Sequence, residues 1–310
     1  MTTIAVFNPE HDLCLANGNK HYMPPLSALD FAERGKNLMQ YLFDGDTICT
    51  TADRVGECAA LINDQIEVVP WGWDAVLTEK LRRQGIDETL LQSDQQLNDL
   101  RQLQHRGAMK KLQPHNRICC TLDDVKGFLS EYQSIVLKAP WSGSGRGLRW
   151  VEGVITGQDE SWIRKTMARQ GSVIAEPKLD VVMNIGIEFV GEDMHLVGYS
   201  LFETTPEGVY RGNLLLTDDE IAERVNAMIG KHMLDSVTQQ LREEIIKIVG
   251  GRYNGPVGVD AAICNHCGKR VMVRCLEANL RYTMGMVAHG FLLRHPERHG
   301  TLFEPMKELH

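Results

Sequence analysis

The sequence feature that most constrains the fold is a glycine-rich loop between two short apolar runs. Ser134–Ala139 and Leu148–Val151 have the composition of β-strands, and Lys138 stands near the end of the first run. Between the runs the chain carries glycine at alternate positions, namely Gly143, Gly145 and Gly147. Glycine lets backbone N–H groups approach phosphate oxygens closely, and a lysine adds a compact positive charge. The segment indicates a phosphate-binding loop, although its composition alone fits a flexible hairpin loop equally well.

The spacing of the glycines excludes two common nucleotide-binding loops. The chain contains no Gly-x-x-x-x-Gly-Lys-Ser/Thr pattern, so it has no P-loop. The three glycines also lack the Gly-x-Gly-x-x-Gly spacing, and a strand rather than a helix is expected to follow them. Both points argue against a dinucleotide-binding fold.

A second group of polar residues lies near the C-terminus. Glu277 and Asn279 stand two residues apart at the end of a predicted strand, so their side chains share one face. Asp260 lies on the preceding predicted strand, and pairing of the two strands as a hairpin would bring it beside Glu277. Carboxylate and amide oxygens suit Mg²⁺. The alternative is that Asp260 and Glu277 are exposed strand residues, but both follow apolar runs, where an unpaired charge is costly.

Together the two segments resemble the ATP-grasp superfamily, in particular biotin carboxylase and the carbamoyl-phosphate synthetase domains. Lys138-Ala followed by a Ser/Gly-rich loop resembles their phosphate loop, and Glu277, Asn279 and Arg281 fill the biotin carboxylase pattern Glu-x-Asn-x-Arg. The resemblance implies that Lys138 and Arg281 act in catalysis, with Lys138 on the nucleotide phosphates. It implies a loop that closes over the phosphates, made of Ser142, Gly143, Ser144, Gly145, Arg146 and Gly147. It also implies Mg²⁺, or Mn²⁺, held by Asp260, Glu277 and Asn279.

Further nucleotide contacts follow from weaker parts of the resemblance. Val173–Leu179 is similar to the segment that links the two ATP-grasp lobes, which makes Glu176 a candidate acid and places the backbone near Lys178 and Leu179 at the adenine. Arg106 matches an arginine that contacts the α-phosphate in carbamoyl-phosphate synthetase. Glu188 resembles a glutamate that holds the ribose in D-alanine ligases, or is a solvent-facing strand residue.

The expected fold is α/β: an ATP-grasp fold, with two α+β lobes clasping ATP, preceded by a small parallel α/β pre-domain. The predicted limits are 1–95 for the pre-domain, 96–175 for the small lobe with the glycine-rich loop, and 176–310 for the large lobe with the metal site. Short apolar runs alternate with helical patterns in the first part, which favours a parallel sheet. A polar helix is expected over Gln95–Lys111 and another over Leu122–Glu131, with Thr121 as its N-cap.

Two further motifs leave alternatives open. In Asn8-Pro-Glu-His-Asp12, which follows the first strand, His11 and Asp12 could contact the substrate, but a turn held by local side-chain bonds is favoured. Cys264-x-x-Cys267 could be half of a zinc site, but no second pair follows at a normal spacing, and a hairpin turn explains the sequence equally well.

Composition narrows the functional classes. A net charge of −8 argues against a broad nucleic-acid surface, and no apolar stretch is long enough to span a bilayer. The N-terminus does not resemble a signal peptide, so the eight cysteines are expected to be reduced and the protein cytoplasmic.

The resemblance implies an Mg-ATP-dependent ligase. It would activate a small-molecule or peptide carboxylate as an acyl phosphate for attack by an amine or a thiol. The alternatives are an ATP-dependent small-molecule kinase and a non-catalytic nucleotide-binding module.

Overall fold

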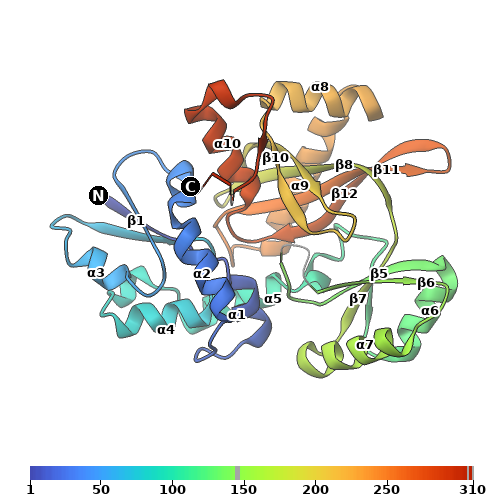
Figure 1. The fold of residues 1–310 in the computed structure, drawn as a ribbon, viewed down its shortest axis with the longest axis horizontal. Helices are drawn as coiled ribbons and strands as arrows, with labels where there is room; N and C mark the ends of the chain where they lie inside the picture. The colour runs from blue at the N-terminus through green and yellow to red at the C-terminus, as the bar shows by residue number, and fades with distance from the viewer. Residues whose placement is uncertain (144–146, 306, 309–310) are drawn as a thin grey trace.

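The computed structural model describes residues 1–143, 147–305 and 307–308. Ser144, Gly145 and Arg146 of the predicted phosphate loop therefore lie outside the described residues. The described strands form three sheets, at residues 2–70, 117–177 and 180–303, and Figure 1 shows the helices arranged around them. The domain limits suggested by the sequence stay a prediction, and for convenience we call the three parts the pre-domain, the small lobe and the large lobe.

The pre-domain sheet is parallel, in the order β2-β1-β3, as the alternating pattern predicts. Its strands are β1 (Thr2–Val6), β2 (Thr47–Thr50) and β3 (Ile66–Pro70). The helices around it are α1 (His11–Asn17), α2 (Leu26–Gly35), α3 (Val55–Ala59), α4 (Ala75–Arg83) and α5 (Asp94–Leu103), with a 3₁₀ helix η1 (Lys36–Leu42) and a short one, η2 (Glu88–Leu90). The apolar side chains of β1 are fully buried, so this strand forms the centre of the pre-domain core.

The small lobe is an antiparallel sheet in the order β4-β7-β5-β6, with two helices packed on it. Its strands are β4 (Arg117–Cys119), β5 (Ser134–Lys138), β6 (Leu148–Glu152) and β7 (Val173–Pro177). The helices are α6 (Leu122–Tyr132) and α7 (Gly157–Gln170). Thr121 caps α6 as predicted, because its side chain accepts the Asp124 N–H while Asp124 accepts the Thr121 N–H.

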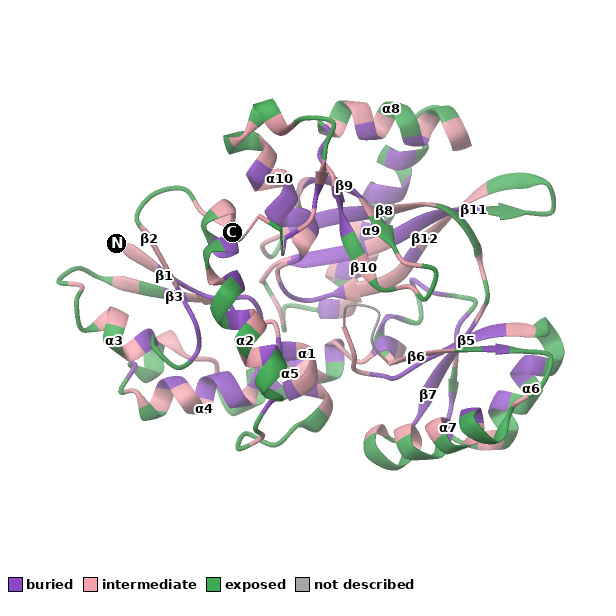
Figure 2. Cartoon of the chain, in the orientation of Figure 1, coloured by how far each residue is buried: buried purple, intermediate pink, exposed green. Residues whose placement is uncertain are grey.

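The large lobe is an antiparallel sheet in the order β12-β11-β8-β9-β10-β13. The strands are β8 (Asp180–Val190), β9 (His195–Thr204), β10 (Tyr210–Leu214), β11 (Val257–His266), β12 (Lys269–Asn279) and β13 (Leu302–Phe303). One face packs on α8 (Asp218–Ile229) and α9 (Met233–Val249). The side chain of Asp260 points to the other face, because Asp260 alternates with the buried Val259 and Ala261, and its register partner Glu277 shares that face. Figure 2 shows the buried strands of this sheet beneath the helices.

The predicted helix over Gln95–Lys111 is wrong beyond Leu103. α5 ends there, and a separate 3₁₀ helix, η3 (Arg106–Met109), follows. The helix breaks because the His105 side chain accepts the Gly107 N–H, and the Arg106 N–H donates to the Pro140 carbonyl instead of to a helical carbonyl. The break turns Arg106 toward the glycine-rich loop.

The pre-domain is fixed to the large lobe through α10 (Met284–Arg294). Arg294 donates to the carbonyls of Gln40 and Phe43, both at 2.5 Å. Gly290 packs so closely on the pre-domain that a Cβ built at this position would overlap the carbonyl oxygen of Tyr41. A short 3₁₀ turn, η4 (Pro296–Arg298), ends this region before β13. No helix among the described residues is long and apolar enough to cross a lipid bilayer.

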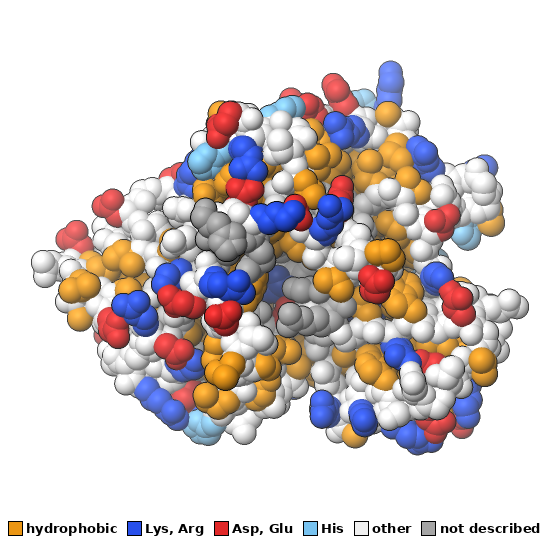
Figure 3. Space-filling model, in the orientation of Figure 1, with side chains coloured by type: hydrophobic (Ala, Val, Ile, Leu, Met, Phe, Trp, Pro, Cys, Tyr) orange, Lys and Arg blue, Asp and Glu red, His pale blue; other side chains and the backbone are white. Residues whose placement is uncertain are grey.

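Figure 3 shows basic and acidic side chains interspersed over the face that it draws. The described residues of that face therefore form no broad basic patch of the kind that binds nucleic acid. The cytoplasmic location expected from the sequence stays a prediction.

Gly290→Ala should destabilise the protein by about 1–3 kcal/mol, because the added Cβ meets backbone that cannot move aside as a side chain can. Gly127→Ala is the matched control: it lies within α6 with nothing within 4 Å of its built Cβ. It should stabilise the protein by up to ~1 kcal/mol through helix propensity. Urea unfolding of the two variants measures the difference. Equal stability of both would show that the α10 contact is not closely packed.

Candidate functional site

Lys138 connects the small lobe to β12, the strand that carries the predicted metal ligands Glu277 and Asn279. It is the last residue of β5, and Glu176 on β7 shares its face because Glu176 pairs with Val136. The Lys138 Nζ lies 2.7 Å from Glu176 Oε2 and donates to the Leu276 carbonyl at 3.2 Å. The other oxygen of Glu176, Oε1, is buried with no hydrogen-bond partner among the described residues. Lys138 and Glu176 therefore lie side by side next to β12, and their roles in nucleotide binding stay predictions.

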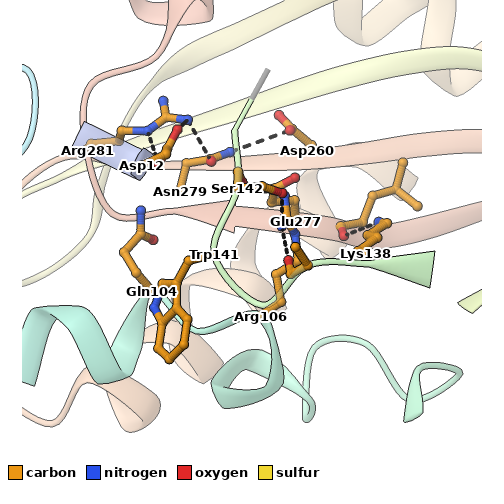
Figure 4. Close-up of polar contacts among 12 residues, drawn as sticks. Asp12, Gln104, Arg106, Lys138, Trp141, Ser142, Asp260, Glu277, Asn279 and Arg281 are labelled. Carbon is orange, nitrogen blue, oxygen red and sulfur yellow. Dashed lines mark hydrogen bonds and ion pairs between the residues drawn. The ribbon is translucent and has the colours of Figure 1, made fainter. Parts of the chain in front are cut away.

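The predicted metal ligands lie together on one face of the large sheet (Figure 4). Asp260 on β11 is the register partner of Glu277 on β12, and Asn279 Nδ2 lies 3.5 Å from Asp260 Oδ2. Burial raises the pKa of Asp260 to about 7, and the negative charge of Glu277 adds to the shift. Among the described residues, no group of three or more His, Cys, Asp or Glu side chains is placed to hold a metal ion.

This set fits Mg²⁺. Its two carboxylates supply the oxygen donors that hard divalent cations prefer, and the oxygen of the Asn279 amide, which accepts from Arg281 in this structure, would supply a third. Two carboxylates held opposite each other in a buried place repel, and a divalent cation between them would relieve the repulsion. The assignment of Asp260, Glu277 and Asn279 as ligands nonetheless stays a prediction.

Arg106 connects the glycine-rich loop to the same strand. Its Nη1 donates to the Ala139 carbonyl at 2.5 Å and to Ser142 Oγ at 2.7 Å. Its Nη2 donates to the Ser142 carbonyl at 2.7 Å and to Glu277 Oε1 at 2.6 Å. Arg106 thus lies within the site, and its buried charge is matched by Glu277. Its predicted contact with the α-phosphate remains a prediction.

The base of the glycine-rich loop is closed by a backbone bond from the Ala139 N–H to the Gly147 carbonyl, at 3.0 Å. Gly147 has φ 74°, a conformation that favours glycine. At the start of the loop, Trp141 donates its indole N–H to the Arg101 carbonyl at 2.9 Å. The described ends of the loop are therefore fixed by α5 and by the two strands.

Arg281 makes the contact that the sequence least anticipates. Its Nη2 donates to Asp12 Oδ2 at 3.0 Å and to Asn279 Oδ1 at 3.1 Å, and its Nε lies 3.3 Å from Asp12 Oδ1. The turn favoured for the Asn8–Asp12 motif is present, but it is closed by a backbone bond, and the Asn8 side chain donates to Gly72 and Asp74 instead of to a local partner. The His11 N–H bonds to the Asn8 carbonyl, whereas Asp12 reaches out of the pre-domain to Arg281.

Glu188 is not a solvent-facing residue, so that alternative is wrong. Only 3% of it is exposed, and Thr283 Oγ1 donates to its Oε2 at 2.9 Å. Cβ atoms built at Gly186, Gly258 and Gly285 would all crowd its carboxyl group, so glycines provide its space. Burial raises the pKa of Glu188 to about 8. A ribose hydroxyl could reach this group only if those contacts opened.

Lys178 and Leu179 lie in the segment between the small lobe and the large lobe, and Lys178 already makes contacts within the small lobe. The Lys178 N–H donates to the Ser134 carbonyl at 2.9 Å, and its side chain pairs with Glu152. Leu179 is half-buried beside it. Adenine recognition by the backbone here stays a prediction.

The cysteines take no part in the site. All eight lie among the described residues and are unpaired, and Cys264 is buried whereas Cys267 is exposed. The hairpin-turn interpretation of these two residues agrees with their place at the tip of β11 and β12.

Comparisons with solved structures identify the fold. D-cycloserine synthetase matches with a TM-score of 0.51 at 12% identity, over 94% of this chain and 99% of that chain. Pyruvate carboxylase from Rhizobium etli matches with a TM-score of 0.52 at 15% identity, over 94% of this chain and 27% of that chain. N5-carboxyaminoimidazole synthetase from Staphylococcus aureus matches with a TM-score of 0.49 at 12% identity, over 94% and 76% of the two chains.

A scan of protein-family models and a search of curated proteins each find no match to the sequence. The likeness of structure is nevertheless sufficient for the fold. The chain has the ATP-grasp fold, and the resemblance drawn from its two motifs is confirmed at that level.

Glu10, in the Asn8–Asp12 motif of the pre-domain, provides a test of that part of the structure. Burial raises the pKa of Glu10 to about 7 from an ordinary value of 4.5, and Asp74 contributes. The unfolded chain therefore releases this proton at lower pH than the folded one, and stability falls as pH rises from 4.5 to about 7. Glu10→Gln removes this loss, so the variant should be more stable than wild type at pH 8, by up to ~3 kcal/mol, and no more stable near pH 4.

Urea unfolding at the two pH values measures this difference. Glu57→Gln, at an exposed glutamate of α3, is the control and should show no such pH dependence. A constant difference between Glu10→Gln and wild type across the range would contradict the assignment.

Proposed function

We propose that the protein is an Mg-ATP-dependent ligase that activates a carboxylate as an acyl phosphate for attack by an amine or a thiol. The observation that carries this proposal is that two cations expected to bind phosphate, Lys138 and Arg106, both contact β12, the strand that carries two of the predicted metal ligands. Lys138 reaches the carbonyl of Leu276, and Arg106 pairs with Glu277, the next residue on β12. The ATP-grasp fold, shared with a synthetase and a carboxylase, supports the same class.

Each residue has a role in this proposal. Lys138 and the described loop ends, Ser142, Gly143 and Gly147, would hold the phosphates, with Arg106 on the α-phosphate. Asp260, Glu277 and Asn279 would hold Mg²⁺, which when bound neutralises charge on the β- and γ-phosphates. The unpartnered Oε1 of Glu176 would be free to accept a hydrogen bond from the nucleotide.

The proposed reaction has two steps. A carboxylate oxygen attacks the γ-phosphorus, the bond from that phosphorus to the bridging oxygen breaks, and ADP leaves with the electron pair. The nucleophile then attacks the acyl carbon, inorganic phosphate leaves, and the nucleophile's proton passes to phosphate or solvent. Arg281 would orient the carboxylate, and Lys138 and Arg281 would stabilise charge on the transferred phosphoryl group.

Binding of a non-hydrolysable ATP analogue, measured by calorimetry with and without Mg²⁺, tests the site. Lys138→Ala should weaken binding roughly ten- to hundredfold, because it removes a charge-assisted contact. Glu277→Gln should abolish most of the Mg²⁺-dependent gain in affinity. Glu203→Gln, at an exposed end of β9, should bind as wild type does. The nucleotide site would be disproved if Mg²⁺ had no effect on wild type or if Glu277→Gln retained its full effect.

Turnover separates the ligase from its alternatives. With a pool of carboxylic acids and hydroxylamine as the amine, a ligase releases ADP and forms a hydroxamate. A small-molecule kinase would instead give a stable phosphorylated product without any amine. Tight Mg-dependent binding with no turnover would favour a non-catalytic module.

A further inference from the structure

The Asp12–Arg281 ion pair joins the pre-domain to the segment that follows β12, between residues 269 positions apart. The two side chains are 15% and 10% exposed, so the pair is largely shielded from water. Arg281 is also held by the Asn279 amide and the Tyr282 carbonyl. The only side-chain bonds of Asp12 found among the described residues are those to Arg281.

Asp12 lines a small cavity beside the metal ligands. Leu15, Gln104, Arg106, Trp141 and Glu277 line the same cavity, so α1, the segment after α5 with η3, the start of the glycine-rich loop and β12 all meet there. The loop passes so close that a Cβ built at Gly143 would overlap Asp12 Oδ2. Figure 4 shows Asp12 and Arg281 at one end of this group and Lys138 at the other. A molecule bound at Asp12 would therefore lie beside the metal ligands and away from Lys138.

The charge of Asp12 restricts what can bind there. Burial alone would raise its pKa, but Arg281 and the nearby His11 and Arg106 lower the pKa below its ordinary value, so Asp12 is ionised at neutral pH. A carboxylate repels phosphate and favours a cation. Arg281 presents a guanidinium, which binds a carboxylate through paired hydrogen bonds.

Separating this pair without replacement would leave two shielded charges uncompensated, which is costly. A molecule that carries both an ammonium and a carboxylate avoids the cost, because it restores one partner to each residue. An α-amino acid is the smallest common molecule of this kind.

We propose that the carboxylate activated by this protein belongs to an α-amino acid whose carboxylate binds Arg281 and whose ammonium group binds Asp12. Asp12 is then a specificity-determining residue, and the ammonium group that it holds is not the attacking nucleophile. This inference rests on the proposed function, since it names the acid substrate of the same site.

The test uses the full chain saturated with Mg²⁺ and the non-hydrolysable ATP analogue. Calorimetry measures the binding of the twenty standard amino acids and D-alanine, and then of the N-acetyl and carboxamide derivatives of any that bind. At least one amino acid should bind, and each derivative should bind roughly ten- to hundredfold more weakly, because each lacks one charged contact.

The Asp12→Asn variant tests whether the ammonium group of the amino acid binds at Asp12. It should weaken binding of the parent amino acid by the same factor of roughly ten to a hundred, while the N-acetyl derivative binds as weakly as it does to wild type. Asp219→Asn, at an exposed carboxylate in the first turn of α8, is the matched control and should bind as wild type does. The derivative series on wild type tests the proposal even if Asp12→Asn fails to fold.

Three results would overturn the inference. The first is that no amino acid binds although the ATP analogue binds with Mg²⁺, which leaves the nucleotide site intact. The second is an N-acetyl derivative that binds as tightly as its parent. The third is failure of the analogue itself to bind, which removes the proposed function and this inference with it.

Discussion

The arrangement of the site depends on how the protein offsets the repulsion between two neighbouring carboxylates, Asp260 and Glu277. They are register partners on adjacent strands, and burial together with the charge of Glu277 raises the pKa of Asp260 to about 7. Such an arrangement destabilises a fold unless positive groups are brought close. Arg106, Lys138 and Arg281 supply those groups, and each comes from a different segment of the chain. The charges of the site therefore help to determine how the segments meet.

The contacts between the parts of the molecule are of two kinds. The pre-domain meets the large lobe through backbone packing at Gly290 and Tyr41 and also through the Asp12–Arg281 ion pair. The small lobe reaches β12 through Lys138, and the loop reaches it through Arg106, which are both contacts of a charged group. Charged contacts in the site therefore join all three parts of the molecule.

The sequence predicts the parts of the site that depend on local spacing. Glu277 and Asn279 follow from the alternation of a strand, Asp260 follows from one hairpin, and Arg281 follows from the resemblance alone. The parallel pre-domain sheet and the Thr121 cap are likewise local patterns. The ATP-grasp fold follows from a resemblance that rests on those same segments.

The contacts that sequence reasoning missed join residues far apart in the chain. Nothing near Asp12 indicates that it meets Arg281, and the place of Arg106 depends on a helix break whose partner, Pro140, lies in another part of the chain. The burial of Glu188 depends on glycines of three separate elements, which no local pattern reveals. Charge partners across lobes are set by packing, so a single sequence does not specify them.

The ion pairs of the site also indicate how a ligand could bind without leaving any buried charge unpaired. Arg106 now contacts Glu277, so a cation at Glu277 and a phosphate at Arg106 would replace one ion pair with two. The same logic applies to Asp12 and Arg281, where a zwitterion would replace one pair with two. In both places the entering molecule must carry charges of both signs: Mg-ATP does so as a complex, and an amino acid does so by itself. A ligand of one sign alone would leave one shielded charge without a partner, so under these two proposals the site would discriminate between ligands by charge pairing.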